Sequence, residues 1–262
     1  MGEGQAFCLV LSQSCGRSGP AGNMFGALRH YLMLAAFFLR GRYFRLARER
    51  RDLLSSHWRI VLEEKQAIHA TEFASGKIAN MQRAIGRFNG LVMPPGSWFS
   101  WWHFVPRPAA HNGFVLGRTL VSGRLAAGYG GGLCQLSGIM YLAALKLGMT
   151  VHERHAHSRD IYREDERYTP LGADAAIVFG HKNLVFRNTT SHVFVWIFEV
   201  EQAALLLRVY AKETVNRAHI EFRREDKAGE NLTAVTTLRH SDETTETVSR
   251  SVYLQNIENE NF

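Results

Sequence analysis

Apolar residues in the first third of the chain recur at steps of three and four positions. This spacing runs through residues 25–70, with an interruption at Gly41, and it places the apolar side chains on one face of a helix. Residues 77–88 repeat the pattern, and Gly90 follows them at a position where helices commonly stop. The sequence therefore predicts helices over residues 25–70 and 77–88.

Beyond residue 90 the apolar runs become short and are separated by turn residues, which is typical of strands. Residues 98–102 are rich in aromatic side chains, which suits a strand or the edge of a sheet. The further strand candidates are residues 114–121, 150–157, 175–179, 184–187, 193–199 and 205–210. Three alternating runs near the C-terminus predict a small antiparallel tail, and they are residues 218–222, 234–238 and 247–254.

One further helix is expected among these strands. Residues 134–147 are apolar almost all round and end at Gly148, so this helix should be buried. The fold class that follows is α+β, with N-terminal helices, a curved mixed or antiparallel sheet around the buried central helix, and a β-rich C-terminal tail.

Composition and charge narrow the class of protein. The apolar share of 46% and the charged share of 21% are those of a folded globular chain, which excludes a disordered chain and a multi-span membrane protein. The net charge of +7 is centred on six arginines within residues 40–51, which could contact an anionic membrane or form a solvated helix face. No nucleic-acid-binding motif accompanies them, so no nucleic-acid partner is predicted.

The beginning of the chain carries no clear signal peptide, and the apolar stretch at residues 32–39 is too short to cross a bilayer. Residues 1–23 are biased towards Gly and Ser and are predicted to form a disordered leader, with Met24 as an alternative start. We therefore expect a cytoplasmic protein whose residues 40–51 could rest on the membrane surface.

Three consecutive glycines, Gly130, Gly131 and Gly132, precede the buried helix. Glycine loses more backbone entropy on folding than other residues, so such a run indicates an unusual backbone conformation or a ligand that approaches the chain closely. The first N–H groups of the following helix lack intrahelical partners and favour an anion. The alternative is a tight turn packed against a neighbour. The glycines and Gln135 are therefore candidates for substrate binding.

Cys134 lies at the start of the same helix, where the helix dipole favours the thiolate. The chain has only three cysteines, too few for a disulfide framework. If residues 150–157 form a strand, His155 and His157 point to the same side, roughly 7 Å apart. One of them could then reach Cys134 and form a Cys–His pair for acyl transfer. The alternative is a small buried cysteine beside structural histidines.

Asp174 follows a turn and could orient a histidine, act as a general acid or base, or cap the turn. A rival use of these side chains is zinc binding by Cys134, His155 and His157, with Asp174 or Glu153 as a fourth ligand. No familiar metal-binding spacing is present, so no cofactor is predicted and zinc is kept as the alternative.

Aromatic residues around position 100 have two interpretations. They belong to the core, or they form a wall on which a sugar could stack. Under the second interpretation Trp98 and Phe99 are candidates for substrate binding.

Four ordered segments contain most of these candidates, and they are residues 89–100, 130–137, 153–158 and 186–189. Together they resemble the VanW family, which is named for an accessory gene of glycopeptide-resistance clusters in bacteria. The resemblance covers about residues 57–211. It implies a link to peptidoglycan or its precursors, because family members occur beside cell-wall-binding modules.

The resemblance also extends the set of candidate residues. A cysteine, a pair of histidines and an aspartate of the family match four candidate catalytic residues here, namely Cys134, His155, His157 and Asp174. Ser137 and Arg154 lie within the matching segments and join the candidates for substrate binding.

Pattern and resemblance together set the expected domains and function. We expect a helical region at 24–76, a VanW-like core domain at 77–211 and a β-rich appendage at 212–262. The preferred hypothesis is a hydrolase or transferase that acts on peptidoglycan or a precursor through the Cys–His pair, linked to glycopeptide (vancomycin) resistance. The alternatives are a non-enzymatic protein that binds a muropeptide or lipid-linked precursor, and an Asp174-based glycan-cleaving enzyme such as a lytic transglycosylase.

Overall fold

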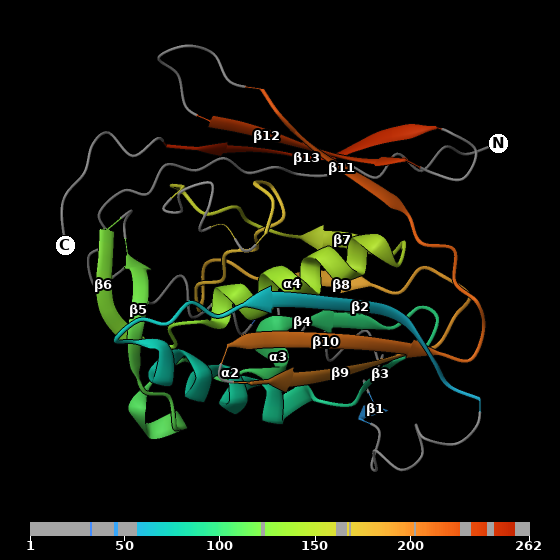
Figure 1. Cartoon of the computed structure of the whole chain (residues 1–262). Coiled ribbons are helices and arrows are strands. Elements are labelled where there is room, and N and C mark those ends of the chain that lie inside the picture. Colours follow the sequence, from blue (N-terminus) through green and yellow to red (C-terminus); the bar gives the residue numbers. More distant parts are fainter. Residues whose placement is uncertain are drawn as a thin grey trace.

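The computed structural model describes residues 32, 45–46, 57–121, 124–160, 167, 169–201, 203–225, 232–239 and 244–254. In this part of the chain the fold is α+β, as predicted, with helices packed among antiparallel sheets (Figure 1). None of the helices in these residues is long and apolar enough to cross a membrane.

A five-stranded antiparallel sheet forms the centre of the fold. Its strands, in order across the sheet, are β1 (Arg45–Leu46), β3 (Leu91–Met93), β9 (Phe194–Val200), β10 (Ala204–Ala211) and β2 (Arg59–Ala67). Two helices pack against this sheet, α2 (Ala74–Phe88) and α4 (Leu133–Lys146). The helices predicted at 77–88 and 134–147 are therefore confirmed, and both are followed by glycines with positive φ, Gly90 and Gly148.

The helix predicted over residues 25–70 is wrong where the structure describes strands, at β1 and β2. Leu32 is helical. Apart from Leu32 and β1, residues 25–56 lie outside the described residues, and so do most of the basic stretch at 40–51 and the predicted leader at 1–23. In β2, Leu62 and Gln66 are buried on alternate positions, and Glu64 between them bonds to Lys146 of α4. Because two of these inward positions are polar, hydrophobicity along the sequence does not show the two-residue period of the strand.

Smaller sheets surround this centre. One has the order β4 (Trp98–Ser100), β8 (Val185–Arg187) and β7 (Thr150–Glu153), and a hairpin joins β5 (Leu116–Val121) to β6 (Arg124–Tyr129). The predicted aromatic strand ends at Ser100, and the chain continues as the helical turn α3 (Trp101–Phe104) and the short 3-10 helix η2 (Ala110–Asn112).

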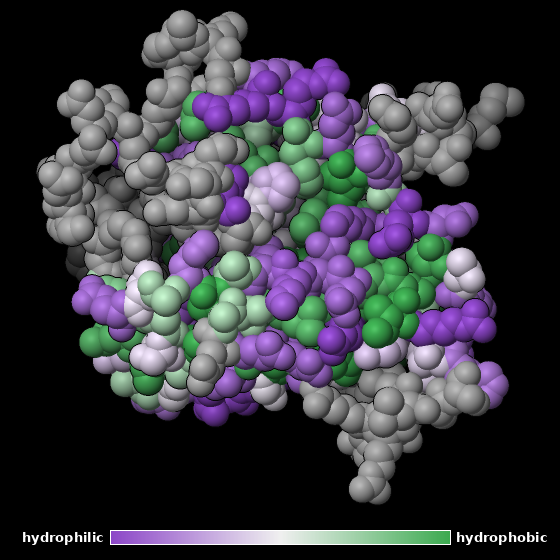
Figure 2. Space-filling model, in the orientation of Figure 1, coloured by the Kyte–Doolittle hydropathy of each residue, from purple (hydrophilic) through white to green (hydrophobic). Residues whose placement is uncertain are grey.

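The predicted β-rich tail is confirmed as a three-stranded antiparallel sheet. Its strands are β11 (His219–Arg224), β12 (Leu232–Arg239) and β13 (Thr245–Tyr253). In Figure 2 the outer surface over these strands is largely hydrophilic. Their other side contributes buried residues such as Leu232, Ala234 and Tyr253, so the sheet is joined to the rest of the molecule by packing.

Two predicted strands are shorter or absent. Strand β7 ends at Glu153 instead of residue 157, and residues 175–179 form an extended segment with one isolated bridge, between Val178 and Lys182. A single backbone hydrogen bond, from Ala176 N–H to the carbonyl of His155, joins the two segments. Local alternation predicted a longer ladder, but the carbonyls of Ala175 and Ile177 accept hydrogen bonds from side chains of α4 instead of from a neighbouring strand.

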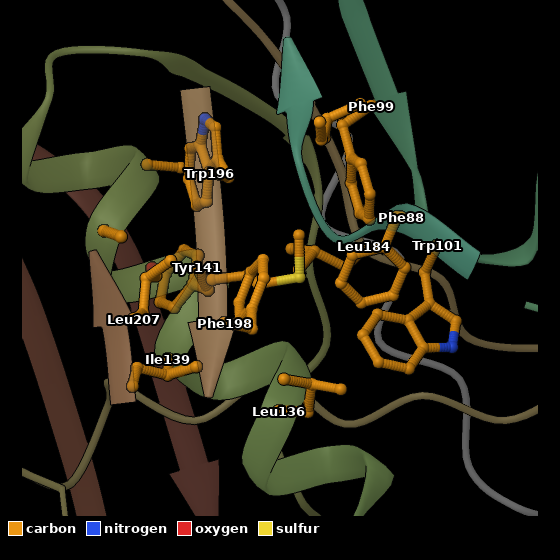
Figure 3. Packing of buried hydrophobic residues seen from close by; sticks show 14 of the residues in the cluster. Phe88, Phe99, Trp101, Leu136, Ile139, Tyr141, Leu184, Trp196, Phe198 and Leu207 are labelled. Carbon is orange, nitrogen blue, oxygen red and sulfur yellow. The ribbon is translucent and has the colours of Figure 1, made fainter. Parts of the chain in front are cut away.

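The core lies between α4, α2 and the sheets (Figure 3). Phe88 is fully buried, and its ring lies 5.3 Å from that of Phe198 and 5.8 Å from that of Trp101, centroid to centroid. Helix α4 is buried nearly all round, as its sequence predicted. Burial of this kind fixes both ends of α4 in space, including the start that carries Cys134.

Candidate functional site

The glycine turn adopts a conformation that other residues would disturb. Gly130 and Gly132 have φ angles of 88° and 96°, in the left-handed region. A Cβ on Gly130 would lie 2.7 Å from Pro108 Cβ, and one on Gly132 would lie 2.6 Å from Lys77 Cγ. The turn is therefore tightly packed as well as left-handed, and it sets the position at which α4 begins.

The N–H groups in the first turn of helix α4 differ in their hydrogen bonding. The N–H groups of Leu133, Gln135 and Leu136 donate to carbonyl groups of the turn, at 3.1–3.3 Å. The N–H of Cys134 has no hydrogen-bond acceptor among the residues that the structure describes. The thiol and an available backbone donor therefore belong to the same residue.

A cavity of about 970 Å³ opens beside this helix start. Its wall includes the glycine turn, Cys134, Gln135, His157 and Asp174. Residues that are far apart in sequence thus share one hollow, with Cys134 half-buried at its wall.

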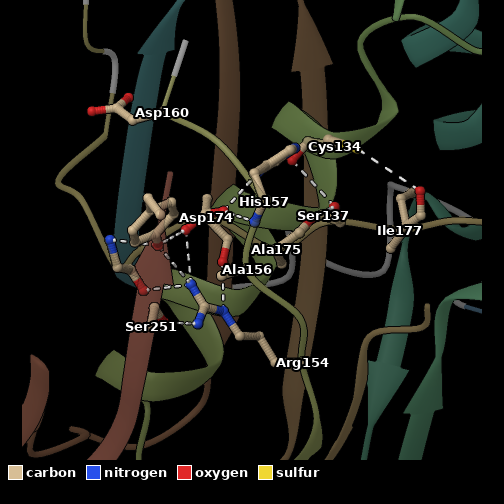
Figure 4. Close-up of polar contacts among 12 residues, drawn as sticks. Cys134, Ser137, Arg154, Ala156, His157, Asp160, Asp174, Ala175, Ile177 and Ser251 are labelled. Carbon is tan, nitrogen blue, oxygen red and sulfur yellow. Dashed lines mark hydrogen bonds and ion pairs between the residues drawn. The ribbon is translucent and has the colours of Figure 1, made fainter. Parts of the chain in front are cut away.

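Asp174 is held by hydrogen bonds on both carboxylate oxygens (Figure 4). Oδ2 accepts from the backbone N–H of His157 at 2.8 Å and lies 2.6 Å from its Nδ1. Oδ1 accepts from Arg154 Nη2 at 2.8 Å and from the Tyr253 hydroxyl at 2.5 Å. Burial alone would raise the pKa of Asp174, but the Arg154 charge, followed by His157 and Tyr253, holds it well below its usual range. Asp174 is therefore an ionised acceptor.

His157 connects this carboxylate to Cys134. Its Nδ1 faces Asp174. The Cys134 thiol donates a long hydrogen bond to the carbonyl of Ile177 at 4.0 Å and is close enough to His157 for the two side chains to shift each other's pKa. Burial on its own lowers the pKa of His157, but the hydrogen bond to Asp174 and the interaction with the Cys134 thiol raise it to about 10. Burial on its own raises the pKa of the Cys134 thiol, but the interaction with His157 outweighs this effect and lowers it. The two shifts together favour a thiolate–imidazolium pair.

The structure separates the two candidate histidines. His155 Nε2 lies 3.0 Å from Glu153 Oε1, which also accepts from the backbone N–H of Asn183 at 3.2 Å. Because β7 ends before these histidines, the alternation that would have placed both on one side does not extend to them. His157, not His155, is brought to Cys134.

Two polar candidates support the site from outside the cavity wall. Ser137 is fully buried and donates to the carbonyl of Ala175 at 2.6 Å, which fastens the segment after Asp174 to α4. Arg154 donates from Nε to the backbone carbonyl of Asp174 and from Nη2 to its carboxylate. Both side chains hold Asp174 in place.

Gln135 lines the cavity, and its Nε2 donates to the carbonyl of Ala67 at 2.8 Å. Its Oε1 is buried and has no hydrogen-bond partner among the described residues. The bond to Ala67 fixes the Gln135 side chain between the start of α4 and the end of β2.

The two aromatic candidates lie elsewhere. Phe99 has no exposed surface and stacks on Phe186 at 4.8 Å in the core. Trp98 is half-buried, and its ring lies 4.3 Å from that of His152. Neither residue belongs to the cavity wall described here, so the core interpretation fits Phe99.

The C-terminal sheet contributes residues that sequence reasoning missed. Tyr253 donates to Asp174 and accepts from the N–H of Gly172 at 3.1 Å, while Ser251 accepts a short hydrogen bond from Arg154. Both are almost fully buried. They lie about eighty positions beyond Asp174 in a tail without any motif, so no local signal marks them.

Metal binding has no geometric counterpart in this part of the chain. No group of three or more His, Cys, Asp or Glu side chains that could hold a metal ion occurs among the described residues. Zinc therefore stays a sequence prediction, for metal analysis to decide.

Comparison with known proteins gives partial matches. The chain is 29% identical over 126 residues to the vancomycin B-type resistance protein VanW of Enterococcus faecalis, and the match covers 48% of this chain and 46% of that protein. It is 25% identical over 137 residues to YoaR of Bacillus subtilis, described as uncharacterized, and this match covers 52% of this chain and 44% of that protein. The chain thus spans less than half the length of these curated relatives, and no solved structure matches it.

A family model also matches the chain, over a region of similar length. A family model described as VanW like protein matches residues 76–210, just over half of the chain. This region contains the glycine turn, Cys134, His157 and Asp174, whereas Tyr253 lies beyond it. The chain belongs to the VanW-like family.

Proposed function

We propose that this protein is a cysteine-dependent hydrolase or transferase that acts on peptidoglycan or a peptidoglycan precursor. The observation that carries the proposal is that the Cys134 thiol shares a cavity wall with His157, which lowers the pKa of the thiol and is itself bound to Asp174. Acyl transfer uses such a nucleophile, base and orienting acid.

In the proposed reaction the Cys134 thiolate attacks the carbonyl carbon of an amide or ester in the substrate. A carbon–sulfur bond forms, and the electron pair of the carbonyl moves to its oxygen. The N–H of Cys134, which has no acceptor among the described residues, could donate to this oxygen. When the intermediate collapses, the leaving amine or alkoxide takes the proton of the His157 imidazolium.

The second half of the reaction releases the acyl group from sulfur. Neutral His157 removes a proton from an incoming water or amine, which attacks the thioester carbon and restores the thiolate. Water gives hydrolysis, whereas an amine gives transfer. Asp174 keeps the imidazole oriented through Nδ1 in both halves.

A glycan-cleaving mechanism with Asp174 as general acid has less support. The carboxylate accepts hydrogen bonds from Arg154 and Tyr253 and contacts His157, and its pKa lies well below the usual range. A general acid must carry a proton at the working pH, and this environment removes it.

The choice of substrate rests on the relatives. The name of the E. faecalis protein connects that protein with resistance to vancomycin. We therefore propose a cell-wall substrate for this chain and a role connected with glycopeptide resistance.

The test is turnover of purified peptidoglycan fragments, followed by mass spectrometry of the products. Replacing Cys134→Ala or His157→Gln should reduce the rate on the order of 1,000-fold or more, because the groups act as a unit. His155→Gln is the matched control and should keep most activity, since its ring contacts Glu153 instead.

Each other outcome selects a different function. Full activity of Cys134→Ala together with an inactive Asp174→Asn variant would indicate glycan cleavage by the carboxylate. Binding of the fragments without turnover by the unmodified protein would indicate an accessory binding protein. In both experiments, thermal unfolding of each variant shows whether the fold survives the substitution.

A further inference from the structure

Basic side chains dominate the charged part of the cavity wall. The lining residues that the structure describes include five lysines and arginines but two aspartates. Both aspartates have cationic partners, because Asp160 accepts two hydrogen bonds from Arg167 and Asp174 pairs with Arg154 and His157. The other basic residues of the described wall are Lys77, Arg107, Arg159 and Lys182, so five cations stand against two aspartates and the formal charge of the described wall is positive.

Two of these cations flank the glycine turn. The stem of Lys77, on α2, lies against Gly132, and Arg107 directly precedes Pro108, which packs against Gly130. Both residues belong to the cavity wall. The turn therefore lies between two elements that each bring a positive charge to the cavity.

Lys182 brings a third cation from the side of His157. Its Nζ donates to the carbonyl of Ala156 at 3.4 Å, next to the imidazole in sequence. Its own carbonyl accepts from Trp102 Nε1 at 2.7 Å, and the bridge to Val178 closes the turn. This ammonium group is thus held beside the candidate base.

We propose that the cavity binds an anionic part of the substrate, a carboxylate or phosphate group, against the wall formed by Lys77, Arg107 and Lys182. The inference rests on the proposed function for its choice of substrate, because peptide ends carry carboxylates and lipid-linked precursors carry phosphates. The three cations come from separate segments of the chain and line the same cavity as Cys134, so a bound anion would hold the substrate in the cavity that contains the thiol. A volume of about 970 Å³ is enough for an extended ligand.

Calorimetry with defined probes tests this site at low ionic strength. The probes are inorganic pyrophosphate, a pentapeptide with a free C-terminal carboxylate, and the same peptide as its C-terminal amide. We expect the Lys77→Gln/Lys182→Gln double variant to bind the anionic probe on the order of 10-fold more weakly, since charge-assisted hydrogen bonds are lost. Arg87→Gln is the control, because Arg87 is an exposed cation on α2 outside the described wall. The Kd of this variant for the anionic probe should equal that of the unmodified protein.

The probes also distinguish the source of the anion. Binding of pyrophosphate alone identifies a phosphate, whereas preference for the free acid over the amide identifies a carboxylate. Equal binding of both peptide forms with no pyrophosphate binding would overturn the proposal, as would an unchanged Kd in the double variant.

This proposal and the proposed catalysis can fail separately. Cys134→Ser should bind the anionic probe as the unmodified protein does, because the thiol is not part of the basic wall. Hydrolysis of an uncharged ester such as 4-nitrophenyl acetate that depends on Cys134, without anion binding, would remove the anion site and keep the catalysis. Anion binding that depends on Lys77 and Lys182, without any Cys134-dependent turnover, would keep the anion site and remove the catalysis.

Discussion

At the scale of single residues, the protonation of Cys134 depends on a balance between burial and a neighbouring charge. Burial disfavours the thiolate, whereas the imidazolium of His157 favours it, and Asp174 in turn favours the imidazolium. The protons on these groups are therefore linked, so removing one group changes the titration of the others.

The pH dependence of alkylation should report this linkage. In a Cys8→Ser/Cys15→Ser background, we expect Cys134 to react with iodoacetamide at pH values below the ordinary thiol pKa of about 8.5. His157→Gln should move the midpoint of the rate profile upward, because burial then acts on the thiol without the compensating cation. The rate is measured by mass spectrometry of the labelled protein.

His155→Gln provides the comparison for this experiment. Its profile should match that of the background protein, because the ring of His155 contacts Glu153. An identical shift in both histidine variants would contradict the assignment of His157 as the partner of the thiol.

At the scale of elements, the start of α4 is fixed by the glycine turn and by the burial of the helix behind it. The left-handed backbone at Gly132 allows the chain to enter the helix directly from strand β6, and Lys77 packs against the position where a side chain would be. The location of Cys134 thus depends on a residue that carries no side chain.

Replacing Gly132 by alanine should therefore destabilise the protein. A non-glycine residue at this φ and the displacement of Lys77 should cost about 1–3 kcal/mol. Urea unfolding measures this change in the free energy of unfolding. Gly86→Ala is the control, since nothing lies within 4 Å of its added Cβ and it lies inside α2, where alanine should stabilise by about 0.5–1 kcal/mol. Equal stability of the two variants would argue against a strained turn.

At the scale of the whole molecule, the site joins the region matched to the family and the C-terminal sheet. The family match ends at residue 210, but Tyr253 and Ser251 bond to Asp174 and Arg154 from β13. The sheet predicted as an appendage thus covers one side of the polar centre, where the side chains of Arg154 and Asp174 are 7% and 15% exposed. Low exposure is what gives the charges there their effect on pKa values.

Tyr253→Phe tests this connection. The change leaves the N–H of Gly172 without its acceptor and removes a donor from Asp174, which should lower the free energy of unfolding by about 1–3 kcal/mol. Urea unfolding of Tyr210→Phe gives the baseline, because the hydroxyl of that half-buried tyrosine on β10 makes no hydrogen bond to any residue that the structure describes. A negligible effect at Tyr253 would show that this hydroxyl does not hold the sheet to the site.

Acid should weaken the whole fold through Asp174. Its folded-state pKa lies below the value in the unfolded chain, about 3.9, so the unfolded state binds more protons in that interval and stability falls as pH decreases. The contribution is present above pH 4 and is lost as pH falls towards the folded-state pKa. Asp174→Asn should lower the free energy of unfolding at neutral pH by about 3–5 kcal/mol, because Arg154 stays buried without its charged partner. On acidification this variant should lose less of its free energy of unfolding than the unmodified protein does, since it has no carboxylate at this position to protonate.

Denaturant unfolding at a series of pH values measures this difference. Glu225→Gln is the control, because Glu225 belongs to an exposed pair with Arg250 and surface pairs contribute little. An acid limb that is unchanged in Asp174→Asn would contradict the role given to this carboxylate.

Local pattern was enough to predict the elements whose side chains carry a clear period. Helix α4 is apolar all round and α2 has one apolar face, so both helices followed from sequence, as did strands β9 and β10. The cysteine, the two histidines and the aspartate were also identified as candidates, because their types and motifs mark them. By contrast, β2 shows no two-residue hydrophobic period, because the inward-facing Glu64 and Gln66 are polar and their burial depends on partners in other elements.

The tertiary structure alone decided how the candidates are arranged. Which histidine meets Cys134 depends on where β7 ends, and the partners of Asp174 include Tyr253, about eighty positions away. Periodicity reports only the direction of side chains within one element, whereas hydrogen bonds and pKa shifts depend on distances between elements. The sequence by itself therefore determined the elements and the chemical groups, and packing determined which groups share a site.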